Sequence, residues 1–298
     1  MSTLCPRIQI APQGPEFSRI VAGMWRMCDW EQAGHLRLIQ ECLELGVTTF
    51  DHADIYGDYQ VQSLFGAALA QQPGLRAKME LVSKCGICLP SRHKPEYRLQ
   101  AYDTSARHII ASAEQSLREL RTDYLDLLLL HRPDPLLDIG EVTHAFNTLH
   151  KAGKVRHFGV SNFSSAQFQA LNAHWPLVTN QIELSPLYWL PIVDGALDLL
   201  QSAGVRPMLW SALGGGRLFG ADCPPALRAT LEALAIKHQV SIATLVYAWL
   251  LRLPCRALPL TGSGRIAAIR EAVAACSLDL PREDWFELWQ AMRGRPVE

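Results

Sequence analysis

Short apolar runs alternate with stretches of helical periodicity eight times along this chain of 298 residues. Most of the runs are continuous rather than alternately apolar and polar, which is typical of parallel strands that are covered on both faces. Eight strand–helix units in a chain of this length predict a (β/α)8 TIM barrel. The expected strands span residues 20–24, 48–51, 79–84, 125–131, 155–162, 177–183, 205–211 and 255–260.

The segments between these runs carry the signals of helices. Between the first two runs, apolar residues recur at helical spacing from Leu36 to Leu43, and Gly46 is expected to end the helix. Ser164 and Gln167 form the sequence pattern of a capping box at the start of another helix. Extra helices are expected at 225–238 and 242–252, and a single last helix from about Ile266.

The N-terminal segment predicts a short β-hairpin ahead of the barrel. Gln9-Ile10 and Arg19-Ile20-Val21 flank a turn that is rich in Gly and Pro. No linker or low-complexity tract divides the chain, so we expect one domain that spans residues 1–298. A doubly wound open sheet is the alternative arrangement, but no G-x-G-x-x-G motif opens any of the expected helices.

The charge balance excludes several classes of partner. The formal net charge is -1 at pH 7, which gives no electrostatic case for binding nucleic acid or an anionic membrane. No run of 18 apolar residues predicts a membrane span, and residues 1–14 lack the apolar core of a signal peptide. Eight scattered cysteines fit a reducing compartment, so we expect a cytoplasmic protein. The sequence leaves the oligomeric state open, a monomer included.

Cys85 and Cys88 form the one C-x-x-C motif of the sequence. Such a pair can be redox-active or can supply half of a zinc site. No second C-x-x-C motif and no paired His motif completes a metal site here. We therefore favour incidental thiols and expect no metal.

Three residues with catalytic chemistry end three consecutive expected strands: Asp51, Lys84 and His131. The carboxyl ends of barrel strands face one shared mouth, and adjacent strands lie about 4.8 Å apart, so these side chains can meet. Tyr56, on the turn after Asp51, can lean over them. A phenol has a reference pKa of about 10, and a neighbouring cation lowers it.

These four side chains predict a proton-transfer site. Lys84 can lower the pKa of Tyr56, Asp51 can hold Lys84 charged and oriented, and His131 can donate a hydrogen bond to a substrate oxygen. Each residue alone has a structural explanation, such as a solvated strand end or a turn cap. Four of them at one barrel mouth favour the functional interpretation.

The motifs FDHADIYG, VSK, LLLLH, FGVSN, NQIE and WSALGGGRL occur in this order and resemble those of the aldo-keto reductase superfamily along essentially the whole chain. VRHFGVSNFS, HRPDP, LGGGRLF and LRLP resemble its bacterial YdhF-like branch. The resemblance implies an NADPH-linked reductase of small-molecule aldehydes or ketones. It also implies a catalytic tetrad of Asp51, Tyr56, Lys84 and His131.

The resemblance further implies a nicotinamide site along the barrel mouth. Ser161, Asn162 and Gln181 match the residues that bind the carboxamide, and Trp210 falls where an aromatic ring stacks on the nicotinamide. A helix cap, a rim amide and a core Trp are the structural alternatives. The implied cofactor contacts are Gly23, Met24, Trp25, Asp51, Ser161, Asn162, Gln181, Trp210, Ser211, Ala212, Leu213, Gly215, Gly216, Arg217, Gly262, Ser263, Gly264, Arg265, Arg270 and Glu271.

Residues 258–272 predict which nicotinamide is used. A helix N-terminus after the last strand favours an anion, and Ser263 and Arg265 can bind a phosphate there. Arg270 can reach the same region, and only NADPH has a 2′-phosphate for these groups to bind. Family members often have polar residues where this chain has Ala268 and Ala272, which weakens the adenine end of the match. A capped surface helix with solvated arginines is the alternative.

Trp25, Tyr188 and Trp189 predict an apolar, aromatic-lined substrate pocket above Tyr56 and His131. The sequence does not identify the physiological substrate. Two other functions stay open: a nicotinamide-binding redox sensor or regulatory subunit with little turnover, and a Schiff-base lyase that uses Lys84. The intact tetrad argues against the first, and Tyr56 with the cofactor motifs argues against the second.

Overall fold

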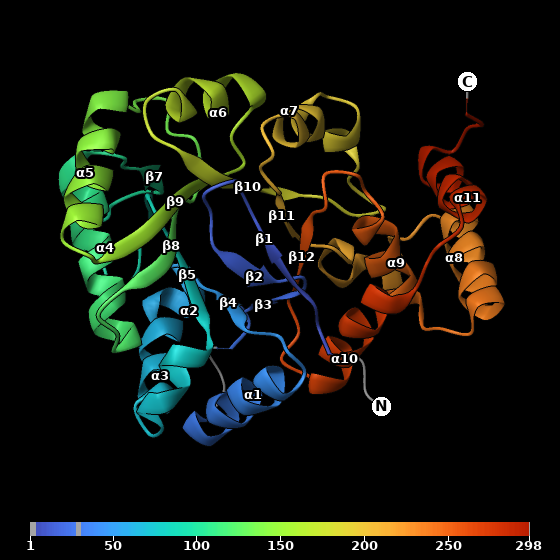
Figure 1. Ribbon diagram of the computed structural model, residues 1–298, viewed down its shortest axis with the longest axis horizontal. Helices are drawn as coiled ribbons and strands as arrows, with labels where there is room; N and C mark the ends of the chain where they lie inside the picture. Colours follow the sequence, from blue (N-terminus) through green and yellow to red (C-terminus); the bar gives the residue numbers. More distant parts are fainter. Residues whose placement is uncertain (1–3, 28–30, 298) are drawn as a thin grey trace.

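Eight parallel strands close into a barrel in the computed structural model, which describes residues 4–27 and 31–297 (Figure 1). Each barrel strand pairs with the next one along the chain, and the last pairs with the first. The (β/α)8 barrel expected from the sequence is therefore confirmed. Around the ring the strands are β3 (Val21–Gly23), β4 (Thr49–Asp51), β5 (Glu80–Cys85), β8 (Leu125–Leu130), β9 (Val155–Ser161), β10 (Leu177–Glu183), β11 (Met208–Trp210) and β12 (Leu258–Thr261).

Helices form an outer layer around this ring (Figure 1). Ser164 forms a complete capping box with Gln167 at α6, as the sequence predicts, and Ser105 caps α4. Because helices cover the outer face of the strands, all six residues of β8 are buried. The helices are α1 (Gln32–Glu44), α2 (Tyr56–Tyr59), α3 (Val61–Leu69), α4 (Ala106–Leu120), α5 (Ile139–Lys151), α6 (Ser165–Asn172), α7 (Ala196–Ser202), α8 (Pro225–His238), α9 (Ile242–Leu251), α10 (Ile266–Ala274) and α11 (Arg282–Arg293).

The N-terminal hairpin pairs β1 (Arg7–Gln9) with β2 (Glu16–Ser18) and lies across the middle of the ring in Figure 1. Phe17 is fully buried beneath it. The paired strands lie slightly earlier in the sequence than predicted, because the Ile10 N–H donates to the Pro15 carbonyl within the turn. Residues 1–3, which open the N-terminal segment considered above, lie outside the described residues, as does Cys28.

Two predictions about the C-terminal third are wrong. The last strand starts at Leu258 rather than at Cys255, because Arg256 has a left-handed backbone conformation that interrupts an extended chain. The one helix predicted at the end of the chain is two helices in the structure, since α10 ends at Ala274 and α11 starts after Pro281. Proline has no N–H group to continue a helix, and here it precedes the first residue of α11.

A second hairpin, β6 (Ile87–Cys88) with β7 (Ala101–Tyr102), lies in a segment predicted only as a polar loop. Within residues 4–27 and 31–297, no single helix is long and apolar enough to cross a membrane. The pair α8 and α9 passes the same test only as two helices at 91° to each other.

Candidate active site

The four predicted catalytic residues meet at the carboxyl end of the barrel strands. Asp51 ends β4, Lys84 lies in β5, and His131 directly follows β8. The Lys84 Nζ atom lies 2.6 Å from Asp51 Oδ2 and 3.0 Å from the Tyr56 hydroxyl. The rings of Tyr56 and His131 are 6.0 Å apart between centroids. The sequence prediction that these side chains lie together is therefore confirmed by their distances.

The turn after β4 positions the phenol. The His52 N–H donates to the Val82 carbonyl and the Asp54 N–H donates to the Lys84 carbonyl, so the chain continues alongside β5 after Asp51. The His52 carbonyl in turn accepts a hydrogen bond of 2.9 Å from Lys84 Nζ. As a result, backbone and side chain of Lys84 both hold the segment that carries Tyr56.

Burial and the neighbouring groups together set the protonation states of Lys84 and Tyr56. Burial alone lowers the pKa of the fully buried Lys84, but the negative charge of Asp51 and the hydrogen bonds to Asp51 and Tyr56 outweigh it, so the pKa of Lys84 is raised. Burial raises the pKa of Tyr56 above its usual value, and the charge of Lys84 offsets only part of that effect. Lys84 therefore lowers the pKa of Tyr56 as expected, but the pKa of the phenol stays above its usual value because burial outweighs that charge. The phenol is protonated at neutral pH.

His131 is a neutral imidazole. Burial, reinforced by the charges of Lys84 and Arg132, lowers the pKa of His131 well below its usual value. Its Nδ1 atom is buried without a hydrogen-bond partner in the described part of the chain, which leaves Nε2 as the ring nitrogen that reaches the cavity. The tautomer with a proton on Nε2 can donate a hydrogen bond to a substrate oxygen.

A hydrogen-bonded chain joins the tetrad to the residues predicted to hold a carboxamide. Gln181 Nε2 donates to Asp51 Oδ1 over 2.8 Å. The Ser161 hydroxyl donates to the Gln181 carbonyl and accepts from Asn162 Nδ2, and Trp210 Nε1 donates to Asn162 Oδ1 over 2.9 Å. The structure therefore brings this polar set together beside the tetrad, with its hydrogen-bonding groups engaged with one another.

A cavity of about 510 Å³ runs from the tetrad to the start of α10. Tyr56 and His131 lie at its inner end, while Lys84 is buried beneath them. The other sequence-predicted residues that line it are Gly23, Trp25, Asp51, Ser161, Asn162, Gln181, Trp210, Ser211, Ala212, Leu213, Gly215, Gly216, Gly262, Ser263, Arg265 and Glu271. Most of the predicted cofactor contacts therefore share one cavity.

Several predicted site residues lie outside the lining of this cavity. Met24 is fully buried, and Arg270 is exposed on α10. Arg217 turns back onto its own loop, where its Nε atom donates to the Gly214 carbonyl. The ring of Trp189 packs against that of Trp289, with centroids 5.2 Å apart. Gly264 and Tyr188 also do not line the cavity.

The cavity fits an elongated ligand with an anionic group. Gly215 and Gly216 have left-handed backbones and would keep open space around an added Cβ, so the chain can approach a ligand closely there. In the described part of the chain no side chain caps the N-terminus of α10, a helix of nine residues, so the N–H groups that precede Ala268 are available to an anion. The buried Thr261 hydroxyl lines the cavity without a partner in the described chain. These features match a nicotinamide dinucleotide.

Sequence reasoning missed further residues of the cavity. Arg132 directly follows His131, and its guanidinium lies 5.5 Å from the ring centre of Trp210. Its position next to a candidate catalytic residue at a strand end was the signal that could have found it. Arg26 Nη2 donates to the Gly215 carbonyl over 3.0 Å and so joins two loops of the rim. The other missed lining residues are Phe219, Ala243, Tyr247, Leu260, Thr261 and Ala268.

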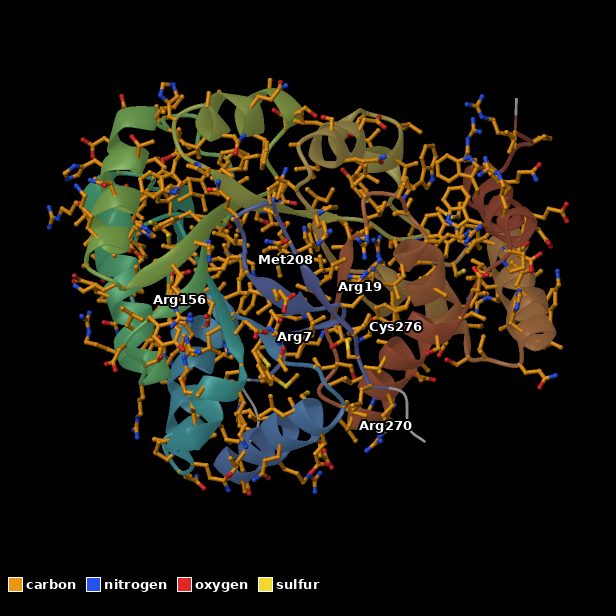
Figure 2. All side chains as sticks on the ribbon, viewed as in Figure 1. Arg7, Arg19, Arg156, Met208, Arg270 and Cys276 are labelled. Carbon is orange, nitrogen blue, oxygen red and sulfur yellow. The ribbon has the colours of Figure 1, made fainter. Side chains whose placement is uncertain are left out.

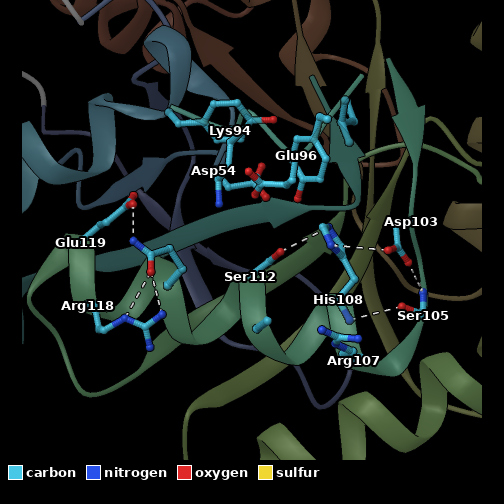
Figure 3. A pocket seen from close by; sticks show the side chains of 15 residues that line it. Asp54, Lys94, Glu96, Asp103, Ser105, Arg107, His108, Ser112, Arg118 and Glu119 are labelled. Carbon is cyan, nitrogen blue, oxygen red and sulfur yellow. Dashed lines mark hydrogen bonds and ion pairs between the residues drawn. The ribbon is translucent and has the colours of Figure 1, made fainter. Parts of the chain in front are cut away.

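A second cavity, of about 530 Å³, shares no lining residue with the first (Figure 3). Its walls mix acids such as Asp54 and Glu119 with cations such as Lys94 and Arg118. Burial raises the pKa of Asp54 to about 7. Because none of the tetrad lines it, the candidate active site is the first cavity.

The structure argues against two alternative functions considered from the sequence, a Schiff-base lyase that uses Lys84 and a reactive Cys85/Cys88 pair. Lys84 is fully buried and protonated, whereas a Schiff-base lysine must react as the neutral amine. Burial raises the pKa of both Cys85 and Cys88, so neither has the thiolate character of a reactive redox cysteine.

Comparisons with known proteins agree with this geometry. The sequence profile of the aldo/keto reductase family matches residues 19–292. The chain is 53% identical to the oxidoreductase YdhF of Escherichia coli strain K12, over 98% of this chain and 99% of that protein. It is 42% identical to a 6-dehydroglucose reductase of Agrobacterium fabrum, over 95% of this chain and 96% of that one.

A solved structure gives the same result. The thermostable aldo-keto reductase Tm1743, in complex with the inhibitor epalrestat, superposes with a TM-score of 0.83. The match covers 96% of this chain and 99% of that one at 25% sequence identity. The similarity therefore extends over the whole barrel, including the loops that carry the tetrad.

Proposed function

Because this chain belongs to the aldo/keto reductase family, we propose that it reduces aldehyde or ketone carbonyls to alcohols, with NADPH as cofactor and Tyr56 as general acid. One observation carries the proposal. The Tyr56 hydroxyl lies 3.0 Å from the buried ammonium of Lys84 inside the cavity that His131 also lines. A protonated phenol beside a fixed cation can give up its proton when negative charge develops on a carbonyl oxygen.

Each tetrad residue has a separate task in this mechanism. The neutral His131 donates from Nε2 to the carbonyl oxygen and so orients the substrate towards Tyr56. Tyr56 transfers its proton to that oxygen, and Lys84 stabilises the phenolate that remains. Asp51 keeps Lys84 charged and in place through its 2.6 Å ion pair. A nicotinamide bound in this cavity would supply the hydride to the carbonyl carbon.

The residues that would hold the cofactor fall into two groups. Ser161, Asn162 and Gln181 offer amide and hydroxyl groups to a carboxamide, with Trp210 as a stacking surface beside them. At the other end of the cavity, the N-terminus of α10 with Ser263 and Arg265 offers N–H groups and a positive charge to a phosphate. Arg265 gives the site its preference for NADPH over NADH.

We propose hydroxylated aldehydes as the substrate class. Two 6-dehydroglucose reductases, 42% and 36% identical to this chain, support the class. Within residues 4–27 and 31–297, the half-buried guanidinium of Arg132 has no hydrogen-bond or ion-pair partner, so its donors can bind substrate hydroxyl groups beside Tyr56. We expect Arg132→Met to reduce kcat/KM for hydroxylated aldehydes about tenfold more than for an unsubstituted aldehyde of similar size. Equal losses would refute this role.

The decisive experiment measures the rate of NADPH oxidation by the wild type and by Tyr56→Phe with aldehydes, ketones, quinones and dicarbonyls as substrates. The variant keeps the ring but loses the proton, so we expect the rate of reduction to fall at least about 10²-fold. NADPH affinity, measured by fluorescence quenching, should stay the same. Near-normal turnover by Tyr56→Phe would contradict the role of Tyr56. A wild type that binds NADPH but turns over none of these carbonyls would instead favour a redox sensor.

A further inference from the structure

The second cavity lies between α4, the turn after β4 and the segment that joins β6 to β7. Helix α4 forms one wall, with Ser105 at its start and Glu119 near its end, and Asp54 and Lys94 come from the other two segments (Figure 3). The volume of about 530 Å³ is within the range of about 300–1,000 Å³ that is usual for small-molecule sites. The cavity is therefore large enough to hold a small molecule.

Several polar groups of this cavity are already paired with each other. The Ser112 hydroxyl lies 3.3 Å from His108 Nε2, and His108 Nδ1 lies 3.7 Å from Asp103 Oδ2. Gln115 Nε2 donates to Glu119 Oε1 over 2.6 Å. A ligand would have to compete with these contacts in order to bind the same groups.

Three charged side chains of the cavity, Asp54, Lys94 and Glu119, are half-buried but not paired with one another. Within residues 4–27 and 31–297, Lys94 Nζ forms no ion pair and no hydrogen bond. Among the same residues, each of the two carboxyl groups uses only one oxygen, which accepts from the Ile55 N–H in Asp54 and from Gln115 in Glu119. Opposite charges therefore line one cavity without contact.

Burial makes the negative charges of this cavity costly. It raises the pKa of Asp54 to about 7 and also raises the pKa of Glu119. The positive charge of Lys94 offsets only part of both effects. The two carboxyl groups therefore favour a further positive charge in the cavity, whereas the unpaired ammonium of Lys94 favours a negative one.

Elsewhere the chain pairs such charges directly. The Asp126 carboxylate lies 2.8 Å from Arg76 Nη2 and 3.1 Å from Nη1 of Arg156, which Figure 2 labels. The second cavity departs from this arrangement, because its unpaired charges of both signs face an open space. A molecule with one charge of each sign would satisfy all three groups.

We propose that this cavity binds a small zwitterion of the α-amino acid class. The ammonium group of the ligand donates to the free carboxyl oxygens of Asp54 and Glu119, and its carboxylate accepts from Lys94 Nζ. An α-amino acid carries these two charges on either side of one carbon atom, so both can be bound in one cavity. The rings of Tyr59 and Tyr97 offer apolar surface to the side chain of the ligand. Since the cavity shares no lining residue with the candidate active site, the inference is independent of the proposed function.

The test begins with the full-length wild type and the twenty common L-amino acids, each at millimolar concentration. A ligand that binds only the folded state raises the melting temperature, so we expect an increase of about 2 °C or more with at least one of them. Isothermal titration then compares this amino acid with its N-acetyl derivative, which lacks the ammonium group, and with its amide, which lacks the carboxylate. We expect each derivative to bind at least about tenfold more weakly.

Two variants then locate the site. Asp54→Asn and Lys94→Gln each remove one charge but keep a hydrogen-bonding group, so each should weaken binding of the amino acid about ten- to a hundredfold. Asp58→Asn is the matched control. Asp58 belongs to the same turn, but its side chain is 47% exposed and does not line the cavity, so the affinity should stay the same.

Three results would overturn the proposal. The first is a wild type that binds none of the amino acids. The second is a derivative with only one of the two charges that binds as tightly as its parent. The third is full affinity in Asp54→Asn or in Lys94→Gln, which would place the amino acid elsewhere. The first two results need only the wild type, so they decide the question even if a variant fails to fold.

Discussion

The ion pair under Tyr56 allows a sharp test, because the chain contains a matched pair on its surface. Lys84 Nζ lies 2.6 Å from Asp51, and Lys154 Nζ lies 2.7 Å from Glu114. The side chains are 0% and 1% exposed in the first pair but 39% and 36% exposed in the second. Lys84→Met and Lys154→Met therefore remove contacts of the same length that differ in burial.

The two substitutions should have very different costs. Loss of one partner of a buried pair leaves an uncompensated charge and costs about 3–5 kcal/mol. After Lys84→Met, the Asp51 carboxylate keeps, among the described residues, only the hydrogen bond from Gln181, so we expect a cost in this range. An exposed pair contributes about 0–1 kcal/mol, so Lys154→Met should lower the free energy of unfolding by less than about 1 kcal/mol.

A double variant identifies the cause of the cost. In Lys84→Met/Asp51→Asn the unpaired charge is gone, so the loss should be smaller than the sum of the single losses by about 1–3 kcal/mol. Urea unfolding followed by circular dichroism measures five proteins, namely the wild type, Lys84→Met, Asp51→Asn, their double variant and Lys154→Met, with the m-value as a check of two-state behaviour. If Lys84→Met and Lys154→Met cost the same, or if the double variant is additive, the argument from burial is refuted.

Two further predictions concern the cofactor and pH. Arg265→Ala should weaken NADPH binding about ten- to a hundredfold at low salt and leave NADH binding unchanged. Fluorescence titration measures both affinities, with Arg270→Ala in α10 as the control variant. Equal affinities of the wild type for NADPH and NADH would exclude the preference. Burial and the charge of Lys84 lower the pKa of His52 from 6.5 to about 3. Between pH 6.5 and the lower value, His52 therefore binds a proton in the unfolded state but stays neutral in the folded state. The free energy of unfolding of the wild type should therefore fall, relative to His52→Leu, by about 1.4 kcal/mol per pH unit between pH 6.5 and 5; parallel pH profiles in denaturant titrations would contradict this.

The positions of the catalytic residues could be predicted because the ends of buried strands can be recognised in the sequence. Continuous apolar runs such as 125–130 identify strands that are buried on both faces, and the residue after each run lies at the barrel mouth. This rule placed Asp51, Lys84 and His131 together without any three-dimensional information. Arg132 follows from the same rule but was missed, because no expected chemistry required a second cation there.

Other properties depend on how much water each side chain loses, which a sequence does not encode locally. The charge of Lys84 acts on Tyr56 as predicted, yet burial outweighs it and raises the pKa of the phenol. Similarly, Trp189 looked like a pocket residue by composition, but it packs on Trp289 of the final helix. The end of α10 was also missed, since its apolar spacing continues past Ala274 and only the fold decides where the chain leaves the barrel.

The catalytic and cofactor-binding groups form one network, and its members come from opposite sides of the barrel. In the closed ring, β4 and β10 are separated by three strands in either direction. Even so, Gln181 on β10 reaches Asp51 on β4, 130 residues away in sequence. Gln181 therefore orients the carboxylate that holds Lys84, and at the same time offers the rest of its amide to the cavity. A change at Gln181 should accordingly alter proton transfer as well as cofactor binding, because the same side chain takes part in both.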